Sequence, residues 1–384
     1  FGIPRFVKKL EHLLKLEGDG EFSLDLAYFN FNARMYSPIL AELLNIDPRL
    51  PDAPITRDHA DIARSAQFLV EEVMLSLAKR VAKLTSSKKL CIGGGVALNC
   101  VANDRIRRSA MFSSVFVPPG AGDAGAAIGA GYLGSLSLSH TTLTGLTNAF
   151  LGPKFTSASI RSYLSKVNVQ FEPLDDEALA NAVADILYQG GFVGWFEGRM
   201  EFGPRALGAR SILADPRYGK TRDALNSRIK RREEFRPFAP VCLASAAREL
   251  FVTCEPEPYM TFTTGVRRPD LIEAVSHIDR TARPQIIDDS CGTRLAKLLK
   301  AFKARTGLAC LINTSFNTAG EPIVCNPQDA FLGFREMGLD ALVLEDVLVV
   351  RARQDPMTMS SGTRDYYEFA RKPQPHVQDT YAFT

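Results

Sequence analysis

The sequence lacks three features that would quickly assign it to a class of protein. It has no apolar run of about 18 residues or more, so we expect neither a membrane-spanning helix nor a membrane partner. None of its seven cysteines forms a C-x-x-C pair, and we interpret them as small buried side chains in a reducing cytoplasm. The formal net charge is only +3, which excludes the global basic field of many nucleic-acid-binding proteins.

The charge that is present is concentrated in one stretch. Residues 199–236 hold nine arginines and two lysines against five acids, a net +6, so the remaining residues sum to 3 − 6 = −3. Arginine is favoured over lysine where a phosphate needs planar, bidentate contacts. The stretch is therefore a candidate anion site. The alternative is a solvated surface on which its arginines pair with Glu201, Asp215, Glu233 and Glu234.

The order of helical and strand patterns predicts an α/β protein with two domains and a tail. In residues 1–150, an amphipathic helix over 57–84 precedes two short strands, each followed by a Gly-rich loop and a helix. A Ser-, Thr- and Gly-rich segment places the domain boundary near residue 150. The second domain, 151–352, should contain a helix over 176–188, strands at "FVGWFEG" and "LACLINTSFN", a helix opened by Asn326 and Pro327, and one closing strand, "ALVLEDVLVVR". Residues 353–384 should form a C-terminal tail.

Three loops carry candidate chemistry. Gly93–Gly95 follow a strand, where backbone N–H groups could approach a phosphate or where the chain needs only a tight turn. Asp123 precedes a helix of small residues and is either an N-cap or a ligand of a divalent cation. In the arginine stretch, Gly203 and Pro204 restrict the backbone before Arg205.

In their order along the chain, these stretches resemble the O-carbamoyltransferase family that modifies antibiotics and nodulation factors. The resemblance covers about residues 55–350 and rests on "GGGVALNC", "PPGAGDAGAAIGA", "GRMEFGPRALGARSILADPR", "FRPFAP", "TARPQ" and "NTSFNTAGEPIV". It implies part of an actin-like (ASKHA) transferase domain, followed by a YrdC-like domain of α+β character. It also implies a biosynthetic enzyme that makes carbamoyl adenylate from ATP and carbamoyl phosphate in the YrdC-like domain. The actin-like domain would then transfer the carbamoyl group to a hydroxyl of a natural product or sugar.

The resemblance further implies roles for individual residues. Two groups of residues would bind the phosphates of Mg²⁺–ATP and carbamoyl phosphate. The first group would also be catalytic and consists of Arg205, Lys230, Arg236 and Ser315. The second group consists of Arg199, Arg210, Arg283, Asn313 and Asn317. Gly94 and Asn99 would contact carbamoyl adenylate in the first domain, and Asp123 would bind an Fe²⁺-type metal. Adenylation brings several anionic oxygens together, so the chemistry needs preorganised cations and no protein nucleophile.

The chain departs from the family pattern in its first domain. The family completes its metal site with two histidines spaced H-x-x-x-H, and no two of the five histidines here have that spacing. An actin-like fold also needs a further half of similar size. We therefore expect the chain to lack an N-terminal half-domain, either as a fragment or as a short member, and its metal site to be incomplete. That half-domain or a second copy of the chain is a candidate partner.

Two other interpretations stay open. An RNA-binding or tRNA-modification-related module would use residues 199–236 as a phosphate track. Only Phe202, Tyr218 and Phe235 are available there for base stacking, so nucleic acid is not the expected partner. An inactive fragment would instead expose apolar surface where a missing half packs.

Overall fold

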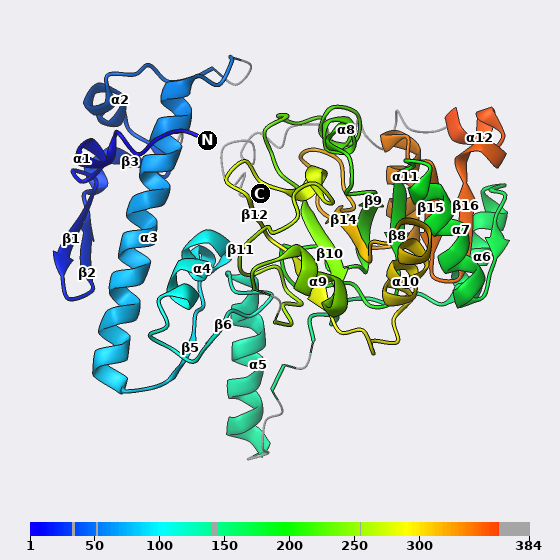
Figure 1. Ribbon diagram of the computed structural model, residues 1–384, viewed down its shortest axis with the longest axis horizontal. Helices are drawn as coiled ribbons and strands as arrows, with labels where there is room; N and C mark the ends of the chain where they lie inside the picture. Colours follow the sequence, from blue (N-terminus) through cyan, green and yellow to red (C-terminus); the bar gives the residue numbers. More distant parts are fainter. Residues whose placement is uncertain (33–34, 51–52, 140–144, 147, 254, 361–384) are drawn as a thin grey trace. The chain divides into compact units, whose positions relative to one another are not determined.

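A computed structural model describes residues 1–384 except 33–34, 51–52, 140–144, 147, 254 and 361–384 (Figure 1). The chain divides into two compact units. Of the described residues, unit 1 contains Phe1–Ile92 and Asn99–Phe116, and unit 2 contains Gly93–Leu98 and those from Val117 to Ser360. Of the expected C-terminal tail, the helix α12 (Pro356–Ser360) is described, and the residues after it lie outside the described part. No described helix combines the length and apolarity needed to span a bilayer.

The division between the units falls between residues 116 and 117, whereas the sequence places the boundary near residue 150. Backbone contacts explain the difference. The N–H of Phe202 donates to the carbonyl of Ala149 (2.7 Å), and a Cβ added at Gly203 would lie 2.4 Å from the carbonyl oxygen of Pro119. Because these contacts join segments far apart in the chain, local composition does not reveal them.

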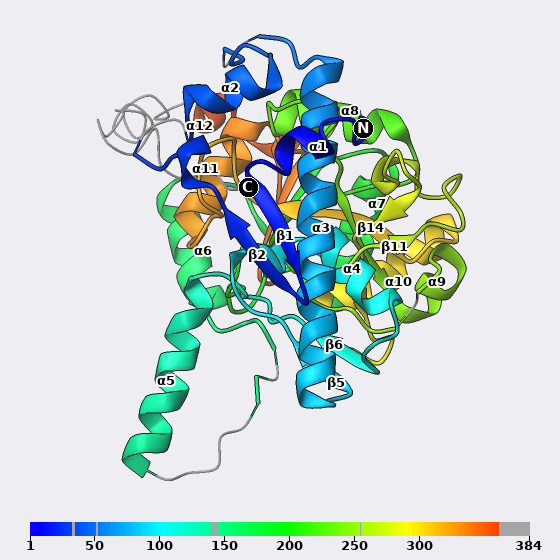
Figure 2. The same ribbon diagram turned by 90° about the vertical axis from the view of Figure 1, so that its left-hand side faces the viewer.

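Unit 1 is built on α3 (Arg57–Thr85), the long helix expected over 57–84, with the β1–β2 hairpin beside it (Figure 2). The other elements of unit 1 are α1 (Val7–Leu10), β1 (Leu14–Gly18), β2 (Glu21–Leu24), η1 (Leu26–Tyr28), β3 (Phe29–Asn30), β4 (Met35–Tyr36), α2 (Pro38–Leu44), β5 (Lys89–Cys91), α4 (Cys100–Arg108) and β6 (Ser114–Phe116). Buried Asp61 ties the start of the chain to α3 by accepting from the backbone N–H of Ile3 (2.7 Å) and from Nε of Arg5 (2.6 Å).

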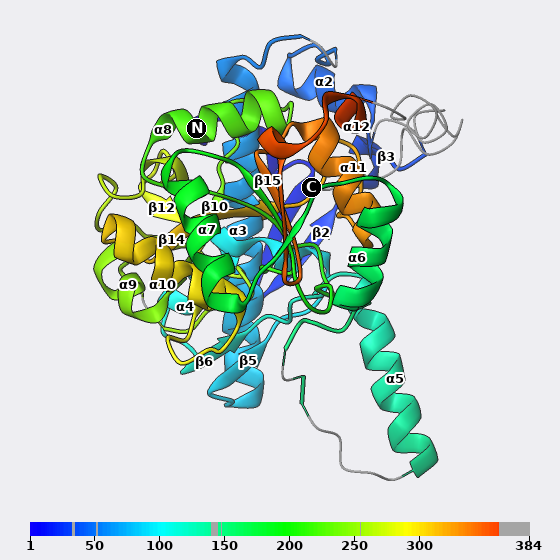
Figure 3. The same cartoon turned by 90° about the vertical axis from the view of Figure 1, so that its right-hand side faces the viewer.

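Unit 2 is organised by an eight-stranded mixed sheet in the order β13-β10-β14-β9-β8-β15-β16-β7. Its strands are β7 (Glu172–Pro173), β8 (Val193–Phe196), β9 (Arg210–Ala214), β10 (Ala239–Leu243), β13 (Gln285–Ile287), β14 (Cys310–Ser315), β15 (Ala341–Leu344) and β16 (Val347–Val350). The helices α7 (Asp176–Tyr188) and α10 (Arg294–Thr306) cover one face, and α6 (Ser157–Lys166), α9 (Ala244–Leu250) and α11 (Pro327–Met337) cover the other. Figure 3 shows α7 and α6 on opposite sides of β15.

The smaller elements of unit 2 join or extend this layered core. They are η2 (Gly95–Leu98), α5 (Ala124–Ser139), α8 (Gly219–Ala224), η3 (Leu225–Ile229), β11 (Thr264–Gly265), η4 (Glu273–Val275), β12 (Thr281–Ala282) and η5 (Arg351–Arg353). The strands β8, β9, β10 and β15 are buried along their whole length, because helices cover both faces of the sheet. The predicted α/β class is confirmed, whereas the actin-like and YrdC-like assignments stay predictions.

The closing strand "ALVLEDVLVVR" is the clearest secondary-structure error. It forms two antiparallel strands, β15 and β16, joined at Glu345 and Asp346. Glu345 has a φ of 56°, in the left-handed region that usually selects Gly or Asn. The sequence has neither residue at this turn, so the reversal carries no local signal.

The start of α11 agrees with the expectation and offers a test of local stability. The side chain of Asn326 accepts from the N–H of Asp329 (2.8 Å), and the Asp329 carboxylate accepts in return from the N–H of Asn326 (3.3 Å). Replacing Asn326 by Ala should lower the free energy of unfolding by about 1 kcal/mol, because the first-turn N–H loses its acceptor. Urea denaturation should show a smaller loss for Asn326→Ser, which keeps a side-chain acceptor. Equal losses in the two variants would contradict the capping role.

Candidate anion-binding site

Lys230 joins two segments that are far apart in the sequence. It follows η3, a single π-helical turn, and its side chain is only 5% exposed. Its Nζ donates to the backbone and side-chain oxygens of Ser315 and Asn317, at 3.2 Å to Ser315 Oγ and 3.0 Å to Asn317 Oδ1. Ser315 Oγ donates in turn to Asn317 Oδ1 (2.6 Å). Three residues expected to meet phosphate therefore form one network at the end of β14.

The loop after Lys230 is held by a buried amide. Asn226 is fully buried, and its Nδ2 donates to the carbonyls of Glu234 (3.1 Å) and Arg236 (2.9 Å). Its Oδ1 accepts from Nε of Arg232 (2.8 Å), whose guanidinium also lies over the ring of Phe238. Asn226 thus determines where the two arginines of this loop can lie, although it was not among the expected site residues.

The cations of this region are close enough to affect one another. Burial, together with the charges of Arg232 and Arg236, lowers the pKa of Lys230 from 10.5 to about 7. Burial, together with Arg236 and Arg283, also lowers the pKa of Arg232 to about 10, although Glu233 opposes the shift. We name these groups, Lys230, Arg232, Arg236 and Arg283, the basic cluster. A bound anion would offset the mutual repulsion of these groups.

His277 lies near one member of the basic cluster. Burial lowers its pKa to about 4, with a further decrease from Arg283 and an opposing effect from Asp279. Its Nδ1 is 3.0 Å from Oγ1 of Thr281. The imidazole is therefore neutral near pH 7 and adds no charge to the cluster.

The loop that carries Arg205 is wound around a carboxylate. Glu201 is 6% exposed, and its Oε1 accepts from the N–H groups of Leu207 (2.7 Å), Ala209 (2.7 Å) and Arg210 (3.1 Å). The alternative in which Glu201 pairs with an arginine side chain does not fit these contacts. The carboxylate instead fixes the backbone that follows Arg205. Arg205 itself is partly exposed.

Two buried amides hold the same loop from the sheet. Asn313 donates to the carbonyl of Ala206 (3.2 Å) and to Oε1 of Gln285 (2.8 Å), and Gln285 donates to the carbonyl of Leu207 (2.8 Å). Asn313 is 2% exposed. It was expected to contact a phosphate, whereas this geometry gives it the task of positioning the Arg205 loop. Gln285 shares that task and was not among the expected site residues.

Arg199 and Arg210 do not join the basic cluster in this structure. Arg199 is exposed and donates to the carbonyl of Gly152 (2.9 Å). Arg210 has no exposed surface, and its guanidinium lies 3.5 Å from the centre of the Phe196 ring while donating to backbone carbonyls. The expectation that Arg210 binds phosphate does not fit this enclosure, because both terminal nitrogens of its guanidinium already have acceptors inside the protein.

The residues expected to serve the transfer step lie in two places. In unit 2, Gly94 and Asp123 belong to neighbouring loops, which are joined by a hydrogen bond from the N–H of Gly94 to the carbonyl of Ala121 (2.7 Å). In unit 1, Asn99 caps α4 by accepting from the N–H of Ala102 (3.1 Å) and donates to Oε1 of Gln67 (2.9 Å). Both the oxygen and the nitrogen of the Asn99 side-chain amide therefore already have hydrogen-bond partners within unit 1.

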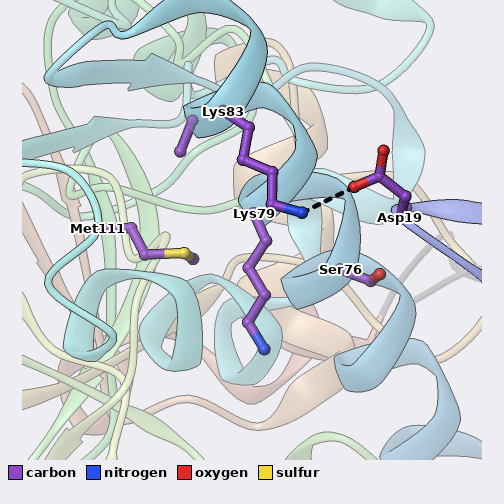
Figure 4. Close-up of a pocket in the computed structure, with 7 residues that line it drawn as sticks. Asp19, Ser76, Lys79, Lys83 and Met111 are labelled. Carbon is purple, nitrogen blue, oxygen red and sulfur yellow. Dashed lines mark hydrogen bonds and ion pairs between the residues drawn. The ribbon is translucent and has the colours of Figure 1, made fainter.

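The expected metal site has no support among the described residues. No group of three or more His, Cys, Asp and Glu side chains suited to a metal occurs in the described ranges, and Asp123 is exposed. A single exposed carboxylate does not fit a tightly held divalent ion. A hollow of about 460 Å³ in unit 1 is lined by Asp19, Ser76, Lys79, Lys83 and Met111 among others, and no expected site residue lines it (Figure 4).

The pKa of Lys230 predicts how stability should change with pH in the absence of ligand. The unfolded chain keeps the lysine proton up to about pH 10.5, whereas the folded protein releases it near pH 7. Between these values the unfolded state binds more protons, so folding stability should rise with pH by at most about 1.4 kcal/mol per unit. Urea denaturation from pH 7 to 9.5 should show this rise in wild type and in Lys220→Met, an exposed-lysine control, but not in Lys230→Met. Parallel curves for wild type and Lys230→Met would contradict the buried, depressed lysine.

Comparisons with known proteins agree with this arrangement of motifs. The chain matches the carbamoyltransferase N-terminus model over residues 2–132 and the carbamoyltransferase C-terminus model over residues 184–351. A solved structure of full-length HypF resembles 48% of this chain and 22% of its own, with 16% identity and a TM-score of 0.32, from which we draw no conclusion.

Similar sequences come from several bacteria. An uncharacterised protein of Synechocystis is 38% identical, over 96% of this chain and 65% of its own length. The nodulation protein NolO of Bradyrhizobium diazoefficiens is 37% identical, over 80% of this chain and 58% of its own length. A 3'-hydroxymethylcephem-O-carbamoyltransferase of Amycolatopsis lactamdurans is 35% identical, over 75% of this chain and 54% of its own length. The chain spans less than two thirds of each of these relatives, and the matched models and motifs together show that it belongs to the carbamoyltransferase family.

Proposed function

We propose that unit 2 joins ATP and carbamoyl phosphate into carbamoyl adenylate, with the phosphate groups held by the basic cluster and Arg205. The observation that carries the proposal is Lys230, an amine that lies among oxygen acceptors and whose pKa is lowered to about 7 by burial and, in addition, by its cationic neighbours. A bound anion should stabilise the charged form of this lysine more than that of an exposed lysine. In the absence of the anion, both burial and the neighbouring cations oppose the charge of Lys230. Mg²⁺ would arrive with ATP as part of the substrate.

The side chains of this site suit positioning and charge neutralisation. Carbamoyl adenylate retains neither the β- and γ-phosphates of ATP nor the phosphate of carbamoyl phosphate, so pyrophosphate and phosphate must both leave. Lys230, Arg236 and Arg283 would offset the negative charge that gathers as these groups meet. Ser315 and Asn317 would exchange their contacts with Lys230 for contacts with phosphate oxygens. Water must first cleave the P–O bond of carbamoyl phosphate, which releases phosphate and carbamate. The carbamate oxygen then attacks the α-phosphorus and displaces pyrophosphate, so no protein nucleophile is required.

The second step in this proposal is transfer of the carbamoyl group to a hydroxyl of a small molecule. The name of the related 3'-hydroxymethylcephem-O-carbamoyltransferase describes transfer to a hydroxymethyl group, which supports this class of acceptor. Gly93–Gly95 and the loop before Asp123 offer backbone N–H groups without bulky side chains, as the approach of an acyl phosphate needs. We route no step through a metal, because the described residues around Asp123 do not fit one. A cytoplasmic biosynthetic role stays a prediction.

The adenylation step predicts exchange of labelled pyrophosphate into ATP that depends on carbamoyl phosphate. Arg236→Ala and Lys230→Met should each lower the exchange rate by roughly a hundredfold, because a cation facing the phosphates is lost. Arg268→Ala is the matched control, since Arg268 is an exposed arginine paired with Glu249 and Asp270. It should retain the wild-type rate.

Other outcomes separate the alternatives. Wild-type exchange no faster than that of Arg236→Ala would reject adenylation by this chain and favour an inactive fragment. RNA binding whose affinity falls steeply with salt, and which weakens in the same two variants, would favour the RNA-binding alternative. Adenylation without transfer to an added hydroxyl compound would assign only the first step to this chain.

A further inference from the structure

A sharp bend at Gly198 connects the sheet of unit 2 to the segment that carries Arg199 and Arg205. β8 ends at Phe196, and the chain bends at Gly198, whose φ of 62° lies in the left-handed region that Gly adopts readily. Because this bend precedes the Arg205 loop, the orientation of the Gly198 peptide affects where the loop begins.

Both polar groups of Gly198 are held by buried side chains of opposite charge. Its N–H donates to Oε1 of Glu345 (2.8 Å), which is 6% exposed. Its carbonyl accepts from both terminal nitrogens of the buried Arg210 (3.3 Å each). A charged partner on each side makes these hydrogen bonds stronger than neutral ones. The bend is therefore clamped between a carboxylate and a guanidinium.

Glu345 is itself held in place from two directions. Its Oε2 accepts from the guanidinium of Arg294 (2.9 Å), whose Nε donates to Asp176 (2.7 Å). Its backbone N–H donates to the carbonyl of Phe196 (2.8 Å), the last residue of β8. Its φ of 56° is strained for a side chain of this kind. These contacts direct the carboxylate toward the bend.

A second carboxylate strengthens the same junction. Glu197 accepts from the backbone N–H of Arg294 (3.2 Å) and from Nε1 of Trp195 (3.1 Å). Glu197 and Glu345 therefore both contact the residue that begins α10. The ends of β8 and α10 and the β15–β16 turn thus meet at one point.

We propose that Glu345 is a positioning residue for the anion site: it holds the Gly198 bend, and through the bend it sets the Arg205 loop in the orientation that binds phosphate. This role rests on the proposed function of unit 2. Among the described residues, Glu345 makes no hydrogen bond or ion pair with the basic cluster, so it acts through the loop. Arg210 holds the other side of the same peptide, which gives a role to an arginine that does not face the site.

The test compares Glu345→Ala, Glu345→Gln and wild type by hydrogen exchange and by binding of inorganic pyrophosphate. In Glu345→Ala, amides of the peptide 197–209 should exchange roughly tenfold faster, while those of β14 should not change. Pyrophosphate affinity should fall roughly tenfold, because the loop is no longer preorganised. Glu345→Gln should recover most of both losses, since its amide oxygen still accepts from Gly198.

The matched control is Asp346→Ala, in the same turn. The Asp346 side chain pairs with Arg161, away from Gly198, so its loss should leave peptide 197–209 protected. If Glu345→Ala is too unstable to study, Arg294→Gln should produce a smaller change of roughly threefold, because Glu345 then loses one of its two anchors. Unchanged exchange of peptide 197–209 in the Glu345 and Arg294 variants, or equal change in Asp346→Ala, would overturn the proposal.

A double-mutant cycle separates positioning from a general loss of stability. In the Arg205→Ala background, Glu345→Ala should cause no further loss of pyrophosphate affinity, because the two substitutions remove the same contact. An additive loss would overturn the proposal. Hydrogen exchange of the loop is measured without any reaction. If wild type shows no adenylation but the Glu345 variants show the predicted changes in hydrogen exchange, only the proposed function would be rejected.

Discussion

The candidate site depends on holding several cations close together, with only the carboxylate of Glu233 seen to pair with one of them, Arg236, among the described ion pairs. Lys230 is the clearest case, because it is buried, its Nζ donates to oxygens of Ser315 and Asn317, and two arginines repel it. Such an arrangement costs folding free energy in the absence of an anion. Because this arrangement of cations lowers folding stability, we infer that it serves binding, and an anion of high charge is the ligand that fits it.

The surrounding polar residues make this arrangement possible. Asn226 holds the loop of Arg232 and Arg236, and Asn313 and Gln285 hold the loop of Arg205. Each uses a buried amide to satisfy backbone groups of an irregular segment. The donors of these buried amides are satisfied by the loops, which favours a single loop conformation. The precision of the site therefore comes from uncharged residues that do not face it.

Local elements were largely predictable from the sequence, because their signals are local. The helix 176–188 has its predicted bounds, and Asn326 caps α11 as expected. The turn at Glu345 was missed because it arises from the pairing of two strands and carries no local signal. The sequence places charge in the arginine stretch but does not distinguish Arg210 from Arg205. Arg210 begins a strand buried on both faces, and only the sheet topology reveals that its side chain is enclosed.

The central claim is that the basic cluster awaits an anion that restores the proton of Lys230. Calorimetric titration with inorganic pyrophosphate at pH 8, repeated in buffers of different ionisation enthalpy, measures that proton directly. Lys230, with its pKa near 7, is mostly neutral at this pH, and a bound anion should raise the pKa. The account predicts uptake of about one proton by wild type and none by Lys230→Met. Binding without proton uptake in wild type, or no binding at all, would contradict it.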